Sequence, residues 1–440
     1  MVKTLTLKNI IGRFRSRWEK APDVRKANNN TRYQVVDAIL AGFSVFFMQS
    51  RSFLEHQRMM QSKKGRSNAS RLFGIERIPS DPQIRNILDP LSAEYFHADF
   101  WFILDGLEKQ GELLSFRSEL GSTLVALDGV TYFSSEQISC PECLKRQDRN
   151  GTAHFYHSAI TPVIVKPGCR QVLSLPPEFI VPQDGSEKQD CERIAAKRWL
   201  AQHHAHVSDS SVTYLGDDVY ANQPLCQLIA ETYHQFFIFV CKPDSHTSLY
   251  EWVTMLERNG GVEDLSQRRW NGRYGENWRY RFAQQIPLRN GEDALNVDWC
   301  ELVITHEDTA EVLYQNAFVT NHAITSDNAV AIVQAGRARW KIENENNNTL
   351  KTKGYHLEHN FGHGQHHLST VLLTLNLLAF LVHTVQELTH SAYQTLRQAL
   401  GSRQTFFNDL CALTRYLLFD DWETLFLFMA DGLEISLPPP

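Results

Sequence analysis

The pattern of apolar and polar positions predicts helical regions at both ends of the chain and a mixed region between them. Residues 28–105 and 366–432 place apolar side chains three and four residues apart, as helices that bury one face do. Between residues 123 and 240, short apolar runs typical of buried strands are followed by alternating helical and strand-like stretches. The chain is therefore expected to combine helical ends with an α/β middle.

The middle region carries acidic residues where its strands end. The predicted elements are a strand at 123–127, strand-like runs at about 153–165 and 171–181, a helix at 190–205, a strand at 212–216, a helix at about 222–233 and a strand at 236–240. Three strands followed by alternating helices and strands favour a mixed sheet covered by helices, an α/β fold. Asp128 and Asp217 directly follow two of these strands, and strand ends are where such folds place their chemistry.

Residues 245–322 interrupt this alternation and predict a β-rich insertion. Arginines alternate with aromatic residues in the stretch that contains Trp270, Arg273 and Trp278. Aromatic rings beside arginines can stack on bases and contact phosphates. A small β-domain with an aromatic core and exposed arginines is the alternative.

Composition and charge add two points. The net charge is −6, yet residues 1–26 hold eight lysines and arginines against Glu19 and Asp23, which makes a basic arm on an acidic body. This arm and the basic loop at 62–68 are typical of a DNA-binding helical module, and a solvated terminus on a helical cap is the alternative.

The cysteines and the longest apolar run bear on the compartment. Eight scattered cysteines and the absence of a signal-peptide-like start fit a reducing cytoplasm. The apolar run from Leu368 to about Val385 contains Asn376 and His383, so we expect a buried helix and no membrane span.

A helix predicted from about residue 325 to about 352 carries a third notable acid. At about 100° per residue, with Glu343 at zero, Arg339 lies at about −40°, Asn347 at about +40° and Lys351 at about +80°. A carboxylate between cations stays ionised at neutral pH, as a metal ligand must. The flanking cations would also suit a site that receives a phosphate group. The alternative is a solvated face with an ion pair between residues four apart.

Asp128, Asp217 and Glu343 form the candidate catalytic group. Carboxylates that converge from separate elements repel one another unless divalent cations neutralise them. Two Mg²⁺ about 4 Å apart are a common arrangement for phosphodiester chemistry. Glu345 is a rival for the third position, but it would point away from the face that Glu343 shares with Arg339.

The three acidic blocks resemble a known family. Leu127-Asp128-Gly129, Leu215-Gly216-Asp217-Asp218-Val219-Tyr220 and Arg339-Trp340-Lys341-Ile342-Glu343 are similar to the motifs of bacterial insertion-sequence transposases with a DDE acid triad, nearest to the ISNCY-like group. The second motif, an Asp followed three residues later by an aromatic, selects Asp217 over Asp218. The resemblance spans about residues 30–390 and implies a ribonuclease-H-like fold.

This resemblance implies a function and a set of partners. The triad would hold two Mg²⁺, with Mn²⁺ as an alternative, for cleavage and strand transfer of double-stranded DNA, namely the terminal inverted repeats and the target. Arg339 and Lys351 would contact phosphate, Trp270 and Trp278 would stack on a flipped base, and Arg273 would bind DNA. A homodimer would join two transposon ends. The alternatives are an inactive DNA-binding descendant and a divalent-metal nuclease without strand transfer.

The implied domains are a helical DNA-binding region at 1–115, a first part of the catalytic core at 116–244, the insertion at 245–322, the catalytic helix with the rest of the core at 323–390, and a C-terminal helical region at 391–440.

The third motif departs from the family in three ways. Gly336 stands where a Tyr is common, Lys351 lies one residue later than usual, and the asparagine run at 346–348 is poor helix material.

A second candidate metal site is a Cys-x-x-Cys pair. Cys140 and Cys143, followed by His154 and His157, offer the thiolate and imidazole ligands of a structural Zn²⁺, for which we select Cys140, Cys143 and His157. Cys191 is a competing ligand, and a turn with two reduced thiols is the alternative.

The histidine-rich stretch at 354–367 is expected to pack behind the catalytic helix or lie along DNA. His363 and His367 are four residues apart but lack the glutamate that a zincin-type metal site needs. A hydrolase is not favoured, because no nucleophile stands in a recognisable elbow.

Overall fold

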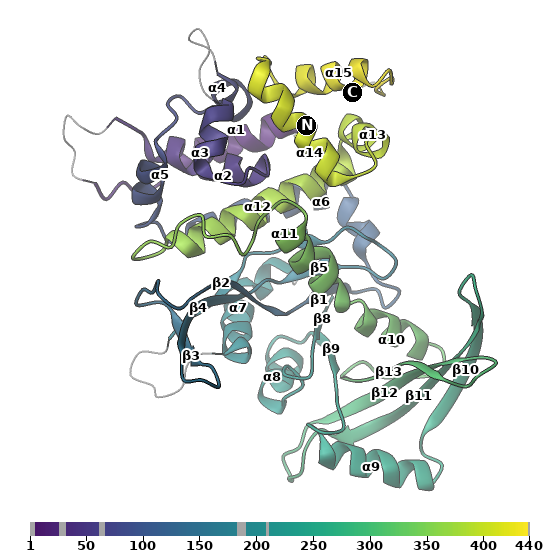
Figure 1. Cartoon of the computed structure of the whole chain (residues 1–440). Helices are drawn as coiled ribbons and strands as arrows, with labels where there is room; N and C mark the ends of the chain where they lie inside the picture. The colour runs from purple at the N-terminus through teal and green to yellow at the C-terminus, as the bar shows by residue number, and fades with distance from the viewer. Residues whose placement is uncertain (1–4, 26–31, 61–66, 183–190, 208–210, 439–440) are drawn as a thin grey trace.

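The structure is a computed structural model of the chain, and it describes residues 5–25, 32–60, 67–182, 191–207 and 211–438. It confirms the α/β class: a nine-stranded mixed sheet and a smaller second sheet lie beneath a layer of helices from both ends of the chain (Figure 1). The nine strands follow the order β10-β11-β12-β13-β9-β8-β1-β5-β6.

Five short strands form the half of the large sheet that carries the acids. They are β1 (Thr123–Ala126), β5 (Val163–Val165), β6 (Leu173–Ser174), β8 (Val212–Gly216) and β9 (Phe236–Val240). Strand β1 is antiparallel to β5 and parallel to β8, β5 is antiparallel to β6, and β8 is parallel to β9. Every residue of β8 is buried, which explains its continuous apolar sequence.

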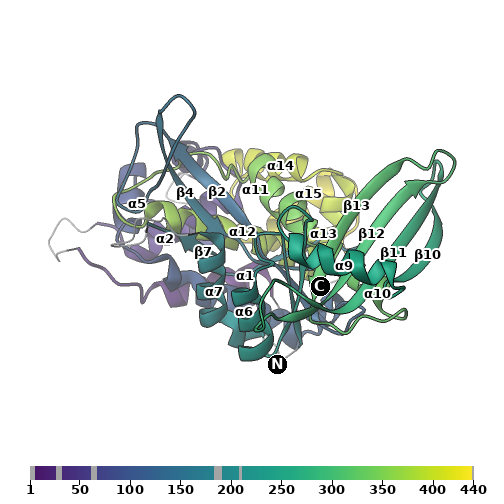
Figure 2. The same ribbon diagram turned by 90° about the horizontal axis from the view of Figure 1, so that it is seen from below.

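The insertion continues this sheet rather than forming a sheet of its own. It consists of α9 (Thr247–Arg258), β10 (Glu263–Trp270), β11 (Gly275–Pro287), β12 (Asn296–His306) and β13 (Val312–Thr320). Strand β13 pairs with β9, so the long strands extend to the side of the molecule opposite the small sheet (Figure 2). The predicted β-rich character is confirmed, and a continuous hydrogen-bond ladder joins the insertion to the core.

The small sheet corrects two of the predicted strands. Its strands are β2 (Gly129–Ser135), β3 (Leu144–Gln147), β4 (Ala153–Ile160) and β7 (Glu178–Ile180). The predicted run at 153–165 is two strands, β4 and β5, which lie in different sheets, and the run at 171–181 divides likewise into β6 and β7. Pro162 lies between β4 and β5, and two prolines lie between β6 and β7. Strands β4 and β6 end before these prolines, because proline has no backbone N–H to donate to a strand ladder.

The remaining helices of the middle region flank the sheets. They are α7 (Glu192–Val207), α8 (Gln223–Gln227) with the π-helical turn η3 (Leu228–Thr232), α10 (Ala329–Arg337), the π-helical turn η4 (Ile342–Asn347) and α11 (Asn348–Thr352). Helix α7 packs against β4 and β7, and α10 packs against β9, β11 and β12.

Helices from the two ends of the chain form a single helical layer. The N-terminal set is α1 (Leu7–Trp18), α2 (Val35–Phe47), α3 (Phe53–Met60), α4 (Asn68–Phe73), α5 (Asp81–Leu88), η1 (Ala93–Phe96), α6 (His97–Lys109) and η2 (Glu112–Phe116); the C-terminal set is α12 (Leu368–Thr389), α13 (Ser391–Ala399), α14 (Arg403–Tyr416) and α15 (Trp422–Gly432). Asn68 donates to the Thr414 carbonyl and Trp422 to the Leu72 carbonyl. The predicted N-terminal and C-terminal regions therefore share one core.

Helix α12 is the apolar run for which we expected a buried helix, and this expectation is confirmed. The helix is long and apolar enough to cross a membrane, but 94% of its most apolar window is buried inside the protein. It packs against α2, α5, α6 and β6, so its apolar surface is covered by the chain itself.

The basic segment at the N-terminus forms the packed helix α1 in its described part, so the alternative of a solvated terminus is wrong for these residues. Phe14 and Trp18 of α1 are fully buried. Arg15 pairs with Glu76 at 2.8 Å, and Arg17 pairs with the buried Asp99 at 2.7 Å. These arginines neutralise acids of the helical layer. Lys3, Lys26 and residues 62–66 of the basic loop lie outside the described residues.

Gly336 explains one departure from the transposase motif and allows a first test. A Cβ atom built on Gly336 in α10 would lie 2.9 Å from Ile238 of β9 and from Phe318 of β13, so the helix sits too close to the sheet for a larger residue. We predict that Gly336→Ala lowers the free energy of unfolding by about 1–3 kcal/mol through overpacking. Urea denaturation followed by circular dichroism measures this.

Gly12 is the matched control, because it also lies in a helix but has nothing within 4 Å of the added Cβ. Gly12→Ala should leave stability unchanged or raise it by up to about 1 kcal/mol, since alanine favours helix. Equal effects of the two substitutions would contradict the close packing of α10 on the sheet.

Candidate active site and metal centre

Two of the predicted acids lie side by side at the ends of parallel strands. Asp128 follows β1 and Asp217 follows β8, and these strands pair in register with Ala126 opposite Leu215. The pairing extends one residue further, where the Leu127 amide donates to the Leu215 carbonyl at 2.8 Å. Adjacent parallel strands thus deliver both carboxylates to the same edge of the sheet.

Three further carboxylates lie near enough to Asp128 to affect its pKa. Burial, and then the nearby carboxylates of Glu192, Glu343 and Asp217, raise the pKa of Asp128 to about 7, while Arg339 opposes the shift. Burial, and then Asp217, also raise the pKa of Glu192. Such mutual repulsion is the condition that a bound divalent cation relieves.

Glu192 is the member of this group that the sequence reasoning missed. It is the first residue of α7, and its side chain lies against the backbone of Gly129, where a Cβ would come within 2.3 Å of Glu192 Oε1. The buried Tyr220 hydroxyl donates to Glu192 Oε2 at 3.4 Å. The only signal in the sequence was an acid in the first turn of the helix that leads into the Asp217 strand.

The segment that carries Glu343 is not the single α-helix that the sequence predicted. Helix α10 ends at Arg337, residues 342–347 form the π-helical turn η4, and α11 adds one more turn. A π-helix is wider than an α-helix, so steps of 100° do not describe this segment. The asparagine run coincides with the change of helix type.

Two asparagines of that run support the acidic group. The Asn347 side chain donates to Asp128 Oδ2 at 3.3 Å and accepts from the Thr161 hydroxyl at 3.1 Å. Asn346 is fully buried, accepts from the Ser174 hydroxyl at 3.3 Å and donates to Asn347 at 3.0 Å. Poor helix formers are therefore suited to this place, because their amides link η4 to the sheet and to Asp128.

The predicted phosphate ligands differ in their surroundings. Arg339 pairs with Glu343 at 2.7 Å, which is the ion pair expected between residues four apart, and it is close enough to Asp128 to affect its pKa. Lys351, which lies on α11, pairs with Glu358 of the following loop at 2.9 Å. Glu345, the rival acid, lies 3.8 Å from Arg170.

The two predicted base-stacking residues of the insertion also differ. Trp270 is 67% exposed at the end of β10, and Arg273 is exposed in the turn that follows. Trp278 is half-buried, and the guanidinium carbons of Arg269 and Arg337 lie 4.2 and 4.8 Å from its ring centroid. Trp278 therefore connects the insertion to α10, while Trp270 is accessible from solvent.

A second cluster gathers two cysteines and two histidines in a mostly buried position. Cys140, Cys143, His157 and His363 each place one ligand atom within 4.8 Å of the others, an arrangement that could bind a metal such as Zn²⁺. Burial, with a smaller effect of His363, lowers the pKa of His157 to about 4, so its imidazole is neutral at neutral pH, as a metal ligand must be.

This cluster joins two groups that the sequence reasoning kept apart. The three predicted ligands come from the segment after Asp128, and the fourth, His363, comes from the histidine-rich loop for which we did not favour a metal. Cys191 and His154 are not members, and His154 instead lies 3.6 Å from Asp148. Sequence spacing could not reveal His363, because 206 residues separate it from His157.

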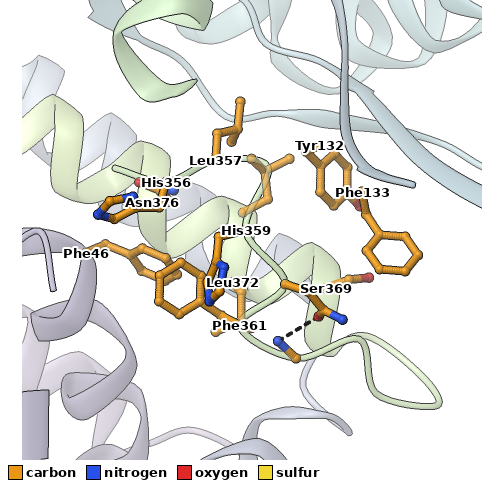
Figure 3. Close-up of a pocket in the computed structure, with 13 residues that line it drawn as sticks. Phe46, Tyr132, Phe133, His356, Leu357, His359, Phe361, Ser369, Leu372 and Asn376 are labelled. Carbon is orange, nitrogen blue, oxygen red and sulfur yellow. Dashed lines mark hydrogen bonds between the residues drawn. The ribbon is translucent and has the colours of Figure 1, made fainter. Parts of the chain in front are cut away.

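The two cavities described next, among the residues that the structure describes, lie away from the acidic group. A small cavity, with about 30 Å³ of space, lies between Tyr132 and Phe133 of β2, the loop at 356–362 and α12 (Figure 3). It has room for about one water molecule and for no substrate. A polar cleft of about 840 Å³ runs past Glu345 and Arg170, and none of the four clustered acids lines it. In the acidic group, Glu343 is exposed to solvent and the other three acids are partly buried.

The acidic group allows a test that needs no substrate. We predict that Mg²⁺ raises the melting temperature of the wild-type protein, since a cation at 100 times its Kd stabilises by about 2.7 kcal/mol. Asp128→Asn should remove this response and leave the metal-free protein at least as stable, because it removes one of four repelling charges. Differential scanning fluorimetry with and without Mg²⁺ measures both effects.

Glu192→Gln should weaken the Mg²⁺ response, and Asp105→Asn, at an exposed position on α6, should leave it intact. An unchanged response in Asp128→Asn would contradict a metal site at this edge.

Comparison with known proteins adds no family assignment: no protein-family model matches the chain, and a search of curated proteins found no significant match.

Proposed function

We propose that this protein is a DDE-type transposase, which cuts DNA at the ends of an insertion sequence and joins them to target DNA. The observation that supports the proposal is that Asp217, Glu343 and a fourth acid, Glu192, come from separate elements to lie near enough to Asp128 to affect its pKa. A solvated charged surface would not raise the pKa of Asp128 to about 7, because that shift comes first from burial and then from the neighbouring carboxylates.

The order of the short strands supports a ribonuclease-H-like core. Strands β1, β5 and β6 are successive antiparallel neighbours, and β8 and β9 are then added in parallel on the other side of β1. Counted along the chain, Asp128 follows the first of these five strands, β1, and Asp217 follows the fourth, β8. The third acid lies on the helical segment that comes after the insertion, as in the family whose motifs this chain resembles.

The residues present fit divalent cations. Asp128, Asp217 and Glu343 would hold Mg²⁺, with Glu192 as a further oxygen donor, and the excess of carboxylates over nearby cations matches the preference of Mg²⁺ for oxygen ligands. Bound Mg²⁺ would supply the Lewis acidity that phosphodiester cleavage needs at the attacking and leaving oxygens.

The chain's own residues would orient the reacting groups. Asn347 holds one oxygen of Asp128 by a hydrogen bond and so limits rotation of that carboxylate. Arg339 neutralises Glu343 in the metal-free protein, and a cation that takes over Glu343 would free the guanidinium to bind a DNA phosphate. Lys351, paired with Glu358, is a more distant phosphate ligand.

The insertion would bind DNA through its exposed end. Trp270 offers an uncovered ring for base stacking and Arg273 a cation for phosphate, both at the turn between β10 and β11. Trp278 would act as a support through its contacts with Arg269 and Arg337. Two DNA ends must be held together for strand transfer, so the working form is proposed to be a dimer on double-stranded DNA.

The central prediction concerns the acids and uses DNA that carries the inverted repeats flanking the gene. Asp217→Asn and Glu343→Gln should each lower Mg²⁺-dependent strand cleavage by at least about 100-fold, because loss of a metal ligand costs at least as much as loss of a group that orients one. Glu345→Gln is the matched control and should retain activity, since Glu345 lies by Arg170 and the polar cleft. Gel analysis of labelled ends measures cleavage.

The same assay separates the alternatives. End binding without cleavage by the wild-type protein would favour an inactive DNA-binding descendant. Cleavage without joined products, scored with a labelled target duplex, would favour a nuclease. Cleavage that persists in Asp217→Asn would show that the acids have been assigned wrongly.

A further prediction concerns the insertion. Trp270→Ala should weaken binding to end DNA by about 1–3 kcal/mol, the usual contribution of a base stacked on an aromatic ring. Trp252→Ala on α9 is the matched control, because Trp252 is also exposed on the insertion but lies on its helix. Fluorescence anisotropy with a labelled end measures both affinities, and equal losses would count against Trp270 as the stacking residue.

A further inference from the structure

We propose that Cys140, Cys143, His157 and His363 bind one Zn²⁺ ion. This ion would fasten the loop at 353–367, which follows α11, to the small sheet that begins after Asp128. The site is closed by four protein ligands and is structural. It lies outside the acidic group and stands independently of the proposed transposase function, because neither its ligands nor its test involves DNA.

The distances between the ligand atoms match a zinc tetrahedron. With Zn–S at about 2.3 Å and Zn–N at about 2.05 Å, tetrahedral geometry places two sulfurs about 3.8 Å apart, sulfur and nitrogen about 3.6 Å apart, and two nitrogens about 3.4 Å apart. The two Sγ atoms are 3.8 Å apart, and the two Nε2 atoms are 3.1 Å apart. The three sulfur–nitrogen contacts between them measure 3.5, 3.4 and 3.4 Å.

A cluster of hydrogen-bonded thiols does not account for this arrangement as well. Hydrogen bonds satisfy groups in pairs, and they do not require four ligand atoms to surround one point. Here five of the six pairs lie within about 0.3 Å of the tetrahedral edge lengths, and the sixth, Cys140 with His363, is within 4.8 Å. Cys143, His157 and His363 are also buried, so a cation bound there would be shielded from water.

Neighbouring groups orient the ligands. Nδ1 of His363 lies 3.1 Å from the Gly364 carbonyl, which can only accept, so Nδ1 carries the proton and Nε2 keeps a lone pair for the metal. The Cys140 amide donates to the Cys143 sulfur at 3.4 Å, within a turn closed by the Cys143 amide and the Cys140 carbonyl. His157 is held in β4, in the hydrogen-bonded ladder with β2.

The loop that carries His363 is anchored on its other side by Asp89. The Asp89 carboxylate accepts from the amides of Gln365, His366 and Leu368, at the start of α12. Phe133 of β2 packs against the His363 ring with centroids 4.5 Å apart. The imidazole thus enters the cluster from a loop that is already positioned, and zinc would complete the connection.

The position of the site gives it a consequence for the acidic group. Strand β2 begins directly after Asp128, and the loop at 353–367 begins directly after α11, which continues from η4 and Glu343. Zinc would therefore connect two segments that are remote in sequence and that each follow one of the clustered acids along the chain. Figure 3 shows Tyr132 and Phe133 of β2 and residues of this loop, among them Leu357 and His359, around the small cavity that they line together.

Metal analysis of the full-length protein tests the proposal directly. Protein expressed in zinc-containing medium and passed over a desalting column should contain about one zinc per chain by mass spectrometry of the metal. Replacement by Co²⁺ should give the visible absorption of a tetrahedral cobalt ion with thiolate charge-transfer bands. Zinc far below one equivalent, together with no such cobalt spectrum, would overturn the proposal without the need for any variant.

Variants then identify the fourth ligand. His363→Asn should weaken zinc binding at least about 10-fold in competition with a chelator, and His359→Asn, at an exposed position in the same loop, should bind like wild type. His363→Cys should restore tight binding and increase the thiolate charge-transfer absorption of the cobalt form, which a purely structural effect would not do. Equal affinity of His363→Asn and His359→Asn would exclude His363 as a ligand.

The structural role has its own readout. Removal of zinc by a strong chelator should lower the melting temperature of the wild-type protein by at least roughly 5 °C, because binding free energy at a structural site is folding free energy. Cys143→Ser should show no chelator effect, while Cys169→Ser, a partly buried cysteine outside the cluster, should respond like wild type. A wild-type protein that binds zinc but melts at the same temperature without it would contradict the fastening role.

Discussion

The half-buried carboxylate of Asp128 lies near the carboxylates of Glu192, Glu343 and Asp217, and this unfavourable proximity is the constraint on which the arrangement around the sheet edge depends. Each acid comes from a different element, and partial burial of two of them makes their charges harder to bring together. The parallel pairing of β1 with β8 contributes two acids through backbone hydrogen bonds that do not depend on charge. Backbone hydrogen bonds thus hold the unfavourable group of charges together. A divalent cation would bind more tightly there, because the carboxylates are already in place.

The helical segment that carries Glu343 needs other supports, because it is not part of the sheet. Asn346 and Asn347 connect η4 to Thr161, Ser174 and Asp128 by buried side-chain hydrogen bonds. Further along, the Cys/His cluster connects the following loop to the small sheet. Helix α12, surrounded by helices from both ends of the chain, closes this side of the molecule. Side-chain hydrogen bonds, the Cys/His cluster and an apolar core therefore follow one another along this stretch of chain.

Local patterns were a good guide where a residue's role depends on its immediate neighbours. The strands at 123–127, 212–216 and 236–240 were predictable because buried central strands are continuously apolar. The runs at 153–165 and 171–181 were misread as single strands, because periodicity does not reveal which sheet a strand joins. Arg15 and Arg17 were interpreted as part of a basic arm, because their partners Glu76 and Asp99 are about 60 and 80 residues away in the sequence.

The sequence by itself determined the α/β class, the buried central strands and the acids at their ends, because all of these follow from apolar runs and the residues that bound them. Only the tertiary structure decided that Glu192 joins those acids, that the asparagine run forms a supporting π-helical turn, and that His363 meets the cysteine pair. Each of these depends on side chains brought together across long stretches of chain. Spacing along the sequence carries no information about such contacts, since they are set by how sheets, helices and loops pack in three dimensions.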